Sequence, residues 1–383
     1  MEAFRDLKNL FIKKDKHKTE NAVFQLHHRV NFIIILVGVT VLLAQNYLNE
    51  NAITCKDEKA YSKAYCWLHG GGHLPPNLAY AASGCVAEQQ ENITNDMNDE
   101  AKAEVEAKNK VVEWRNKRIT SYYIWMPYVL VLCAALAKLP RFIWKTMGER
   151  GVTESVMQLR EDSVKMGERT VKLLDDSFRS KFFVLSFTFC EFLNIVTLII
   201  NFSILDKLLG GQFWSYGSKV IDHMIDEKES NPMCTVFPTE VSCDVSYGGS
   251  TGDTDNKNII CILSNNAFNQ YYFFVLWIWW TALLVVSILT FIYSLIKLSV
   301  PQVSTQNFMR VLSLHGVDYT NQLNGLSNYD FYLLGRIASN LKGSEIEAWV
   351  NEVGARRQRS APHVVVDNNT ENQALTSNEM EMM

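Results

Sequence analysis

The sequence lacks a strong excess of charge of either sign. Its 383 residues include 37 Lys and Arg against 41 Asp and Glu, a net charge of −4. This balance argues against nucleic-acid binding and against a strongly acidic partner. The motifs G-x-x-x-x-G-K-[ST] and H-E-x-x-H are missing as well. We therefore expect no enzyme, no catalytic residue and no cofactor.

The chain also lacks the pattern of a cleaved signal peptide. Residues 1–29 are highly charged, and the apolar run that follows is longer than a typical signal core. We expect the first apolar run to remain in the protein as an anchor.

Long apolar runs are what the sequence does have, in four blocks. A helix needs roughly 20 apolar residues to cross the hydrocarbon core. The four blocks span 30–48, 122–139, 182–205 and 271–296. They carry only two charged residues, Lys138 at the end of the second block and Glu191 within the third. A core helix of a soluble protein rarely runs this long without a polar face. The pattern predicts an all-α membrane protein, a four-transmembrane-helix bundle.

The charges between the blocks predict the orientation of the chain. Segments 1–29, 140–181 and 297–383, with Lys138, hold 24 basic and 20 acidic residues; loops 49–121 and 206–270 hold 13 and 20. Because Lys and Arg accumulate in cytoplasmic loops, both tails and the middle loop should be cytoplasmic and the other two loops extracellular.

The cytoplasmic segments should be partly helical. The middle loop, over about 149–180, has the spacing of an amphipathic helix, and 327–341 and 344–353 also read as helices. Ser344 and Glu347 have the spacing of a capping box. We expect a helical cytoplasmic region over 297–355 and a disordered polar tail over 356–383.

The cysteines follow this topology. Six of the eight lie three and three in the two extracellular loops: Cys55, Cys66 and Cys85, then Cys234, Cys243 and Cys261. Disulfides form in oxidising compartments. A metal site would favour close C-x-x-C pairs with histidines nearby, which are not present. Six cysteines allow fifteen pairings; one hypothesis nests them as Cys55–Cys261, Cys66–Cys243 and Cys85–Cys234, and bridges within single loops are the alternative.

Other polar features are candidates for structural or functional roles. Asn92 begins the sequon in the first extracellular loop, a candidate glycosylation site. Glu191 opens a polar band in the third block that should face the bundle interior and tie helices together, continuing through Asn194, Thr197 and Asn201. Pro127 should kink the second block.

Several short motifs, in order, resemble the innexin family. The second block opens with a close match to the signature Y-Y-Q-W-V-P, with Tyr122, Tyr123, Trp125 and Pro127 in place. Residues 65–67, Y-C-W, resemble a first-loop motif, and 276–279, L-W-I-W, resemble the entry to the fourth span. The resemblance covers roughly residues 20–300. Ile124 and Met126 depart from the signature, and Cys85 and Cys234 look like an added pair that bonds to each other.

The resemblance implies a large-pore channel subunit of the plasma membrane. Innexins form octameric rings, and two rings on apposed cells dock through their extracellular loops into a gap junction that passes ions and small metabolites. The amino-terminal segment is expected at the pore mouth, with candidate pore-lining residues Arg5, Asp6, Lys8, Lys13 and Lys14; a solvated tail is the alternative. The expected partners are self or other innexin subunits and membrane lipid. Two other functions stay open: an undocked hemichannel, and a tetraspan adhesion or scaffold protein without a pore.

Overall fold

The computed structural model describes residues 20–47, 52–56, 60–73, 119–120, 122–148, 154–159, 161–226, 231–248, 252–314 and 326–360. The described residues divide into two compact units. The first contains Glu20–Lys145 and Thr188–Ser294, and the second contains the described parts of Thr146–Phe187 and of Leu295–Met383. Cys85, Asn92 and all five pore-lining candidates of the amino-terminal segment lie outside the described residues.

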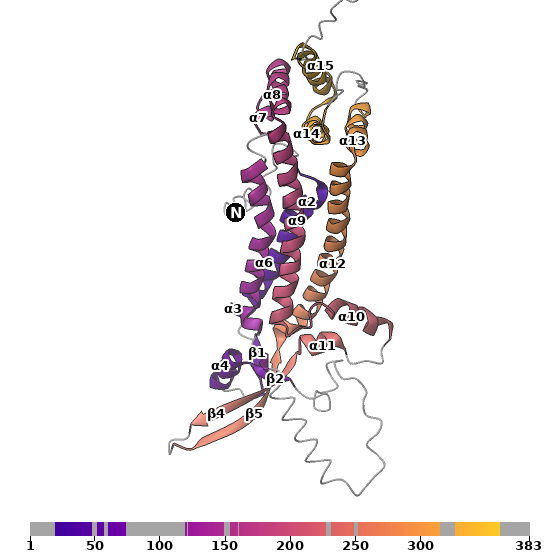
Figure 1. Ribbon diagram of the computed structural model, residues 1–383. Coiled ribbons are helices and arrows are strands. Elements are labelled where there is room, and N and C mark those ends of the chain that lie inside the picture. Colours follow the sequence, from indigo (N-terminus) through magenta and orange to yellow (C-terminus); the bar gives the residue numbers. More distant parts are fainter. Residues whose placement is uncertain are drawn as a thin grey trace, which may run out of the picture. The chain divides into compact units, whose positions relative to one another are not determined.

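Four long apolar helices dominate the chain, as the sequence predicts (Figure 1). The first runs over Ala22–Tyr47 and consists of α2 (Ala22–Gln25), a π-helical turn η1 (Leu26–Asn31) and α3 (Phe32–Tyr47). The others are α6 (Tyr122–Trp144), α9 (Ser177–Leu208) and α12 (Ser264–Ser299). Each is longer than its apolar block because the helix continues into polar sequence. Helix α6 is continuous through Pro127 and Pro140.

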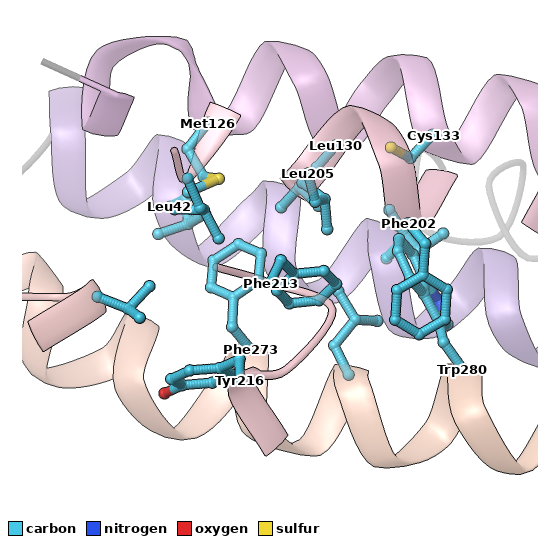
Figure 2. Packing of buried hydrophobic residues seen from close by; sticks show 14 of the residues in the cluster. Leu42, Met126, Leu130, Cys133, Phe202, Leu205, Phe213, Tyr216, Phe273 and Trp280 are labelled. Carbon is cyan, nitrogen blue, oxygen red and sulfur yellow. The ribbon is translucent and has the colours of Figure 1, made fainter. Parts of the chain in front are cut away.

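The core of the first unit is built from large aromatic and aliphatic side chains of all four helices (Figure 2). Phe202 of α9 packs against Phe213 and edge-on against Trp280 of α12, with ring centroids 5.5 and 5.3 Å apart. Leu42 of α3 and Met126 of α6 are fully buried in the same cluster. The polar band of α9 is buried too, at Glu191, Asn194, Thr197 and Asn201, as expected.

The two loops at one end of this unit share a five-stranded sheet of order β1-β5-β4-β2-β3. Its strands are β1 (Ile53–Cys55), β2 (Gly71–His73), β3 (Ile119–Thr120), β4 (Glu240–Gly248) and β5 (Thr254–Leu263). Three helices complete the loops: α4 (Ala60–His69), α10 (Tyr216–Ile225) and α11 (Pro232–Val236). The long β4–β5 hairpin projects beyond β1 and α4 (Figure 1). The helical class is confirmed, and the sheet is an addition that the hydropathy pattern does not predict.

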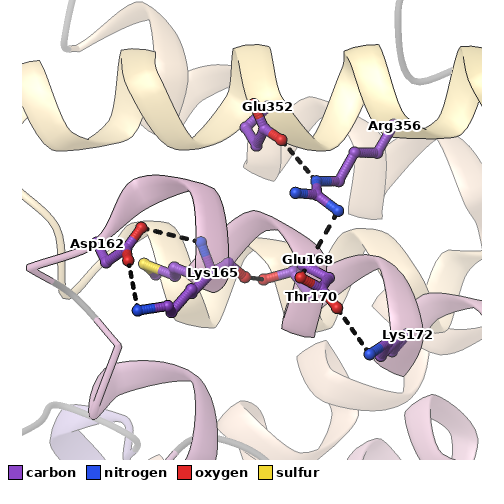
Figure 3. Close-up of polar contacts among 8 residues, drawn as sticks. Asp162, Lys165, Glu168, Thr170, Lys172, Glu352 and Arg356 are labelled. Carbon is purple, nitrogen blue, oxygen red and sulfur yellow. Dashed lines mark hydrogen bonds and ion pairs between the residues drawn. The ribbon is translucent and has the colours of Figure 1, made fainter.

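The second unit contains α7 (Glu154–Met157), α8 (Ser163–Asp175), α13 (Pro301–Ser313), α14 (Asn328–Ala338) and α15 (Gly343–Ser360). Helix α8 packs on α15: the buried Trp349 indole Nε1 donates to Thr170 Oγ1 at 3.1 Å. Around this contact, Glu168 pairs with Lys172 and with Arg356, and Arg356 also pairs with Glu352 (Figure 3).

Two carboxylates of α8 show how its amino-terminal half is stabilised (Figure 3). Asp162 caps the helix by accepting from the Lys165 amide, and this hydrogen bond lowers the pKa of Asp162. The hydrogen bond from Lys172 lowers the pKa of Glu168. Since folding lowers both pKa values, the stabilisation is present above the usual carboxyl range and is lost as the pH falls through the folded-state values.

Two expectations for the carboxyl-terminal region were wrong. Helix α15 begins at Gly343, so Ser344 lies inside the helix, and the first turn is closed by Glu345, which accepts from the Lys342 amide at 2.8 Å. The capping box occurs instead at Ser327 and Asp330 of α14. Helix α15 also continues to Ser360, past the boundary expected at residue 355; residues 361–383 lie outside the described part.

Candidate functional site

Two disulfides join the loops that share the sheet. Cys55 of β1 bonds to Cys261 of β5, where the two residues are direct partners in the strand register. Cys66 of α4 bonds to Cys243 of β4. Both bridges run between the loops, as in the nested hypothesis, and all four residues are buried. Cys234 is also disulfide-bonded; because Cys85 lies outside the described residues, the Cys85–Cys234 pair stays a prediction.

The two disulfides lie next to each other. Sulfur atoms of Cys55, Cys66 and Cys261 all lie within 4.8 Å of one another. This spacing would suit metal ligands, but each sulfur belongs to a disulfide and is not a thiolate. The cluster is therefore a covalent junction that holds α4, β1, β4 and β5 together.

The signature residues connect the amino-terminal end of α6 to this junction. The buried Tyr123 hydroxyl lies within hydrogen-bonding distance of the carbonyl oxygens of Cys66 and Trp67, at 3.1 and 3.0 Å. The Tyr123 and Trp67 rings pack with centroids 4.8 Å apart. Tyr122 donates to the Val236 carbonyl oxygen at 3.2 Å, in the other loop. The signature tyrosines thus anchor both loops on one helix, while Pro127 is buried and Trp125 is exposed.

Helix α10 of the second loop is anchored on α12. The Tyr216 hydroxyl donates to the Gln270 carbonyl oxygen at 2.8 Å, and burial raises the pKa of Tyr216 above its usual value. Gly217 faces Trp277 so closely that an added Cβ atom would overlap the indole ring. Trp277 Nε1 in turn donates to the Trp214 carbonyl oxygen at 3.1 Å.

The amino-terminal half of the first helix is held by polar contacts. His27 Nε2 lies 2.6 Å from Ser287 Oγ of α12, and Asn31 Oδ1 accepts from Trp280 Nε1 at 2.8 Å. Glu20 pairs with Arg141 of α6, and Asn21 donates to Glu191 of α9. His27 and Asn31 lie in η1, and π-helical turns are frequent at functional sites.

One face of the first helix is exposed in the described part of the chain, and its contact with α6 is a hydrogen bond between the hydroxyls of Tyr47 and Tyr128, 2.6 Å apart. Its exposed positions recur every three or four residues, as one stripe along a helix: Val30, Ile33, Val37, Thr40, Ala44 and Tyr47. The opposite side, with Ile35, Val39 and Leu42, is buried in the core. We call these six exposed residues the free stripe.

The residues that hold the first helix do not stand out in the sequence. Glu20 and Asn31 are buried, and Asn21 is partly buried. Their signal in the sequence was weak: a carboxylate and an amide ten and nine residues before the apolar block 30–48, and a single Asn near its start. A polar residue buried in a membrane helix is unfavourable unless it has a hydrogen-bonding partner. This rule would have identified Asn31 as a structural residue.

Four apolar helices with two disulfide-linked loops at one end define a multi-pass membrane protein. Comparison with known proteins narrows this class. The family model described as Innexin matches residues 20–356. The chain is 26% identical over 370 residues to Innexin inx3 of Drosophila melanogaster, covering 91% of this chain and 88% of that protein. Innexin inx2 of Schistocerca americana is 27% identical over 312 residues, covering 79% and 82%, and Innexin shaking-B of Drosophila melanogaster is 26% identical over 321 residues, covering 80% and 82%.

The chain belongs to the innexin family. Membership makes it a multi-pass plasma-membrane protein and a gap-junction channel subunit rather than an enzyme. It also implies assembly of several copies, because one four-helix subunit does not enclose a large pore.

Proposed function

We propose that eight copies of the chain form a ring around an aqueous pore. Two such rings, in the membranes of apposed cells, dock through the disulfide-linked loops and pass ions and small metabolites between the cytoplasms. In this arrangement, loops 49–121 and 206–270 are extracellular, and segments 1–29, 140–181 and 297–383 are cytoplasmic. The observation that carries the proposal is the match to the innexin family over residues 20–356, and the charge distribution supports the orientation.

Within the ring, we propose that the free stripe faces the pore. The exposed side chains of α12 are bulky and apolar over their middle turns, at Val285, Val286 and Leu289, which suits lipid. The free stripe includes Thr40 and Ala44. A wide pore selects by its diameter and by rings of side chains repeated by symmetry, without a coordinating filter.

The amino-terminal segment would continue this path at the cytoplasmic mouth. Its candidate pore-lining residues are Arg5, Asp6, Lys8, Lys13 and Lys14. Symmetry would repeat each charge eight times, so single substitutions should change charge selectivity more than they change folding.

A second candidate function is an undocked hemichannel that releases metabolites across one membrane. The sequon at Asn92 favours it, because a glycan on the first loop would obstruct docking between rings. Removing the sequon with Asn92→Gln should then increase coupling between cells.

The experiment is expression in paired cells that have no junctional coupling of their own. Conductance and dye transfer across the contact support the junction. Current in single cells without transfer between pairs supports the hemichannel. Surface expression with no current in either arrangement would contradict both and favour the adhesion or scaffold alternative.

A further inference from the structure

Two consecutive residues at the start of the first helix bind two different neighbouring helices. Glu20 pairs with Arg141 of α6, and Asn21 Nδ2 donates to Glu191 Oε1 of α9 at 2.5 Å. We call these four residues the root clamp. Since residues 1–19 join the bundle at Glu20, the root clamp is the point at which the amino-terminal segment is attached.

The Glu20–Arg141 pair is shielded from solvent. The exposed fraction of the side chain is 2% for Glu20 and 11% for Arg141. A buried ion pair is weak evidence for stability, but removing one partner is strongly unfavourable because the other charge stays buried. Its role is therefore better described as fixing one position of the helix start than as adding net stability.

His28 completes the surroundings of this pair as a neutral neighbour. Arg29 Nε donates to His28 Nε2 at 3.3 Å, so that nitrogen acts as an acceptor, and His28 Nδ1 donates to the Phe24 carbonyl oxygen at 2.9 Å. His28 Nε2 lies 3.5 Å from Glu20, and because this nitrogen carries no proton the contact is neither a hydrogen bond nor an ion pair. The charge that balances Glu20 across the helices is Arg141.

Asn21 has two functions at once. Its Oδ1 accepts from the Phe24 amide at 2.8 Å and caps the first helix, while its Nδ2 contacts Glu191. Glu191 is buried in the apolar middle of α9, where a carboxylate is costly and usually functional. The beginning of the first helix is thus coupled to the buried carboxylate of the third.

A small cavity with several polar side chains in its lining adjoins this contact. Asn21, Glu191, His27, Asn194 and Ser287 contribute to its lining. It leaves about 10 Å³ for the centre of a water molecule, which is room for one. The cavity is therefore large enough for one water molecule and too small for a small-molecule ligand.

We propose that the root clamp positions the start of the first helix against the second and third helices and thereby sets the conducting state of the channel. The proposal rests on the proposed function, in which the first helix lines the pore. Loosening the clamp would let Ala22–Asn31 move relative to α6 and α9, and the free stripe would change its position in the pore.

The chain offers variants that separate the clamp from the cap. Asn21→Ser keeps a good capping side chain but cannot reach Glu191 with an amide. Glu191→Gln keeps an oxygen that accepts from Asn21 and removes the charge, so it is the matched control. Glu20→Gln and Arg141→Gln are tested singly and together, because a true pair is non-additive.

The first measurement is hydrogen exchange on the purified full-length protein in lipid nanodiscs. We expect amides of residues 22–31 to exchange about tenfold faster in Asn21→Ser and Glu20→Gln, with β4 and β5 unchanged. Glu191→Gln should stay within about twofold of the wild type. Unchanged exchange at 22–31 in both clamp variants would overturn the proposal, and this readout does not depend on the channel conducting.

The second measurement is the conductance–voltage relation at matched surface expression. Asn21→Ser and Glu20→Gln should displace it, and the Glu20→Gln/Arg141→Gln double variant should be no further from wild type than the worse single variant. Faster exchange with an unaltered conductance–voltage relation would overturn the proposal that the root clamp sets the conducting state. A wild type without current would contradict the proposed function instead, and the exchange data would still decide whether the clamp holds the helix.

Discussion

The Tyr123 hydroxyl lies 3.1 Å from the carbonyl oxygen of Cys66, the residue that bonds to Cys243. A signature residue of a membrane-spanning helix is thereby connected to the covalent junction between the two loops. The same hydroxyl is 3.0 Å from the Trp67 carbonyl oxygen. The innexin motifs Y-Y-x-W and Y-C-W, which are separate in sequence, form one contact in the fold.

Tyr123→Phe tests this contact with the loss of a single oxygen atom. The variant loses the one hydroxyl donor that lies near both carbonyl oxygens, and the Cys66 oxygen keeps the Gly70 amide as a donor, so the variant should be destabilised by roughly 1 kcal/mol. The measurement is the temperature at which the detergent-solubilised protein loses its gel-filtration peak. Tyr61→Phe is the control, because Tyr61 is 55% exposed; equal shifts in the two variants would contradict the assignment.

The spacing of the sulfur atoms predicts unequal effects for the two partners of one disulfide. Cys243→Ser releases the Cys66 thiol next to the Cys55–Cys261 bridge, within reach for thiol–disulfide exchange. Cys66→Ser releases Cys243, which is not part of that cluster of three sulfurs. Non-reducing peptide mapping should find Cys66 bonded to Cys55 or Cys261 in Cys243→Ser, and an intact Cys55–Cys261 bridge in Cys66→Ser. The same pairing of Cys55 and Cys261 in both variants would refute the prediction.

Gly217→Ala should displace α10 from α12. The added methyl group overlaps the Trp277 indole, whose Nε1 is already held by the Trp214 carbonyl oxygen. Overpacking of this kind costs about 1–3 kcal/mol. Gly248→Ala is the matched control, because an added Cβ at Gly248 meets nothing within 4 Å. A thermal unfolding midpoint that falls as far in Gly248→Ala as in Gly217→Ala would argue against the close approach.

Thr170→Val tests the packing of α8 on α15. The substitution nearly preserves shape but removes the acceptor of the buried Trp349 indole, at a cost of about 1–3 kcal/mol. Amides of α15 should exchange faster with solvent in Thr170→Val, whereas Thr170→Ser should retain most of the protection. Equal protection in wild type and Thr170→Val would show that this hydrogen bond does not hold the helices together.

The sequence predicted the helices and the interior polar band because both follow from periodicity and from the cost of polar groups in lipid. Glu191, Asn194, Thr197 and Asn201 share a helical face, and all four are buried. The pairing of Cys55 with Cys261 needed more than spacing, since it depends on the register of β1 against β5. Strands β1, β2 and β3 have three residues or fewer, too few to show an alternation. Strand β4 does alternate, with Val241, Cys243 and Val245 at every second position, a signal that is overlooked when only long apolar blocks are considered.

A competing local hydrogen bond explains why the capping box expected at Ser344 was wrong. Ser344 and Glu347 have capping-box spacing, but Glu345 accepts from the Lys342 amide and starts the helix one residue earlier. The clamp formed by Glu20 with Arg141 and by Asn21 with Glu191 joins residues more than a hundred positions apart. No local pattern encodes such a partner, so tertiary structure was needed to find it.

The most direct test of the account is the accessibility of the first helix from the pore. Thr40→Cys and Val37→Cys place thiols on the free stripe; Val39→Cys places one on the buried side, and Leu289→Cys one on the exposed face of α12. The native free cysteines of the described residues, Cys133 and Cys190, are buried. A charged, membrane-impermeant thiol reagent should reduce the current through Thr40→Cys and Val37→Cys channels and leave Val39→Cys and Leu289→Cys unchanged. Inhibition through Leu289→Cys with no effect at Thr40→Cys or Val37→Cys would contradict the account, because a face other than the free stripe would then line the pore.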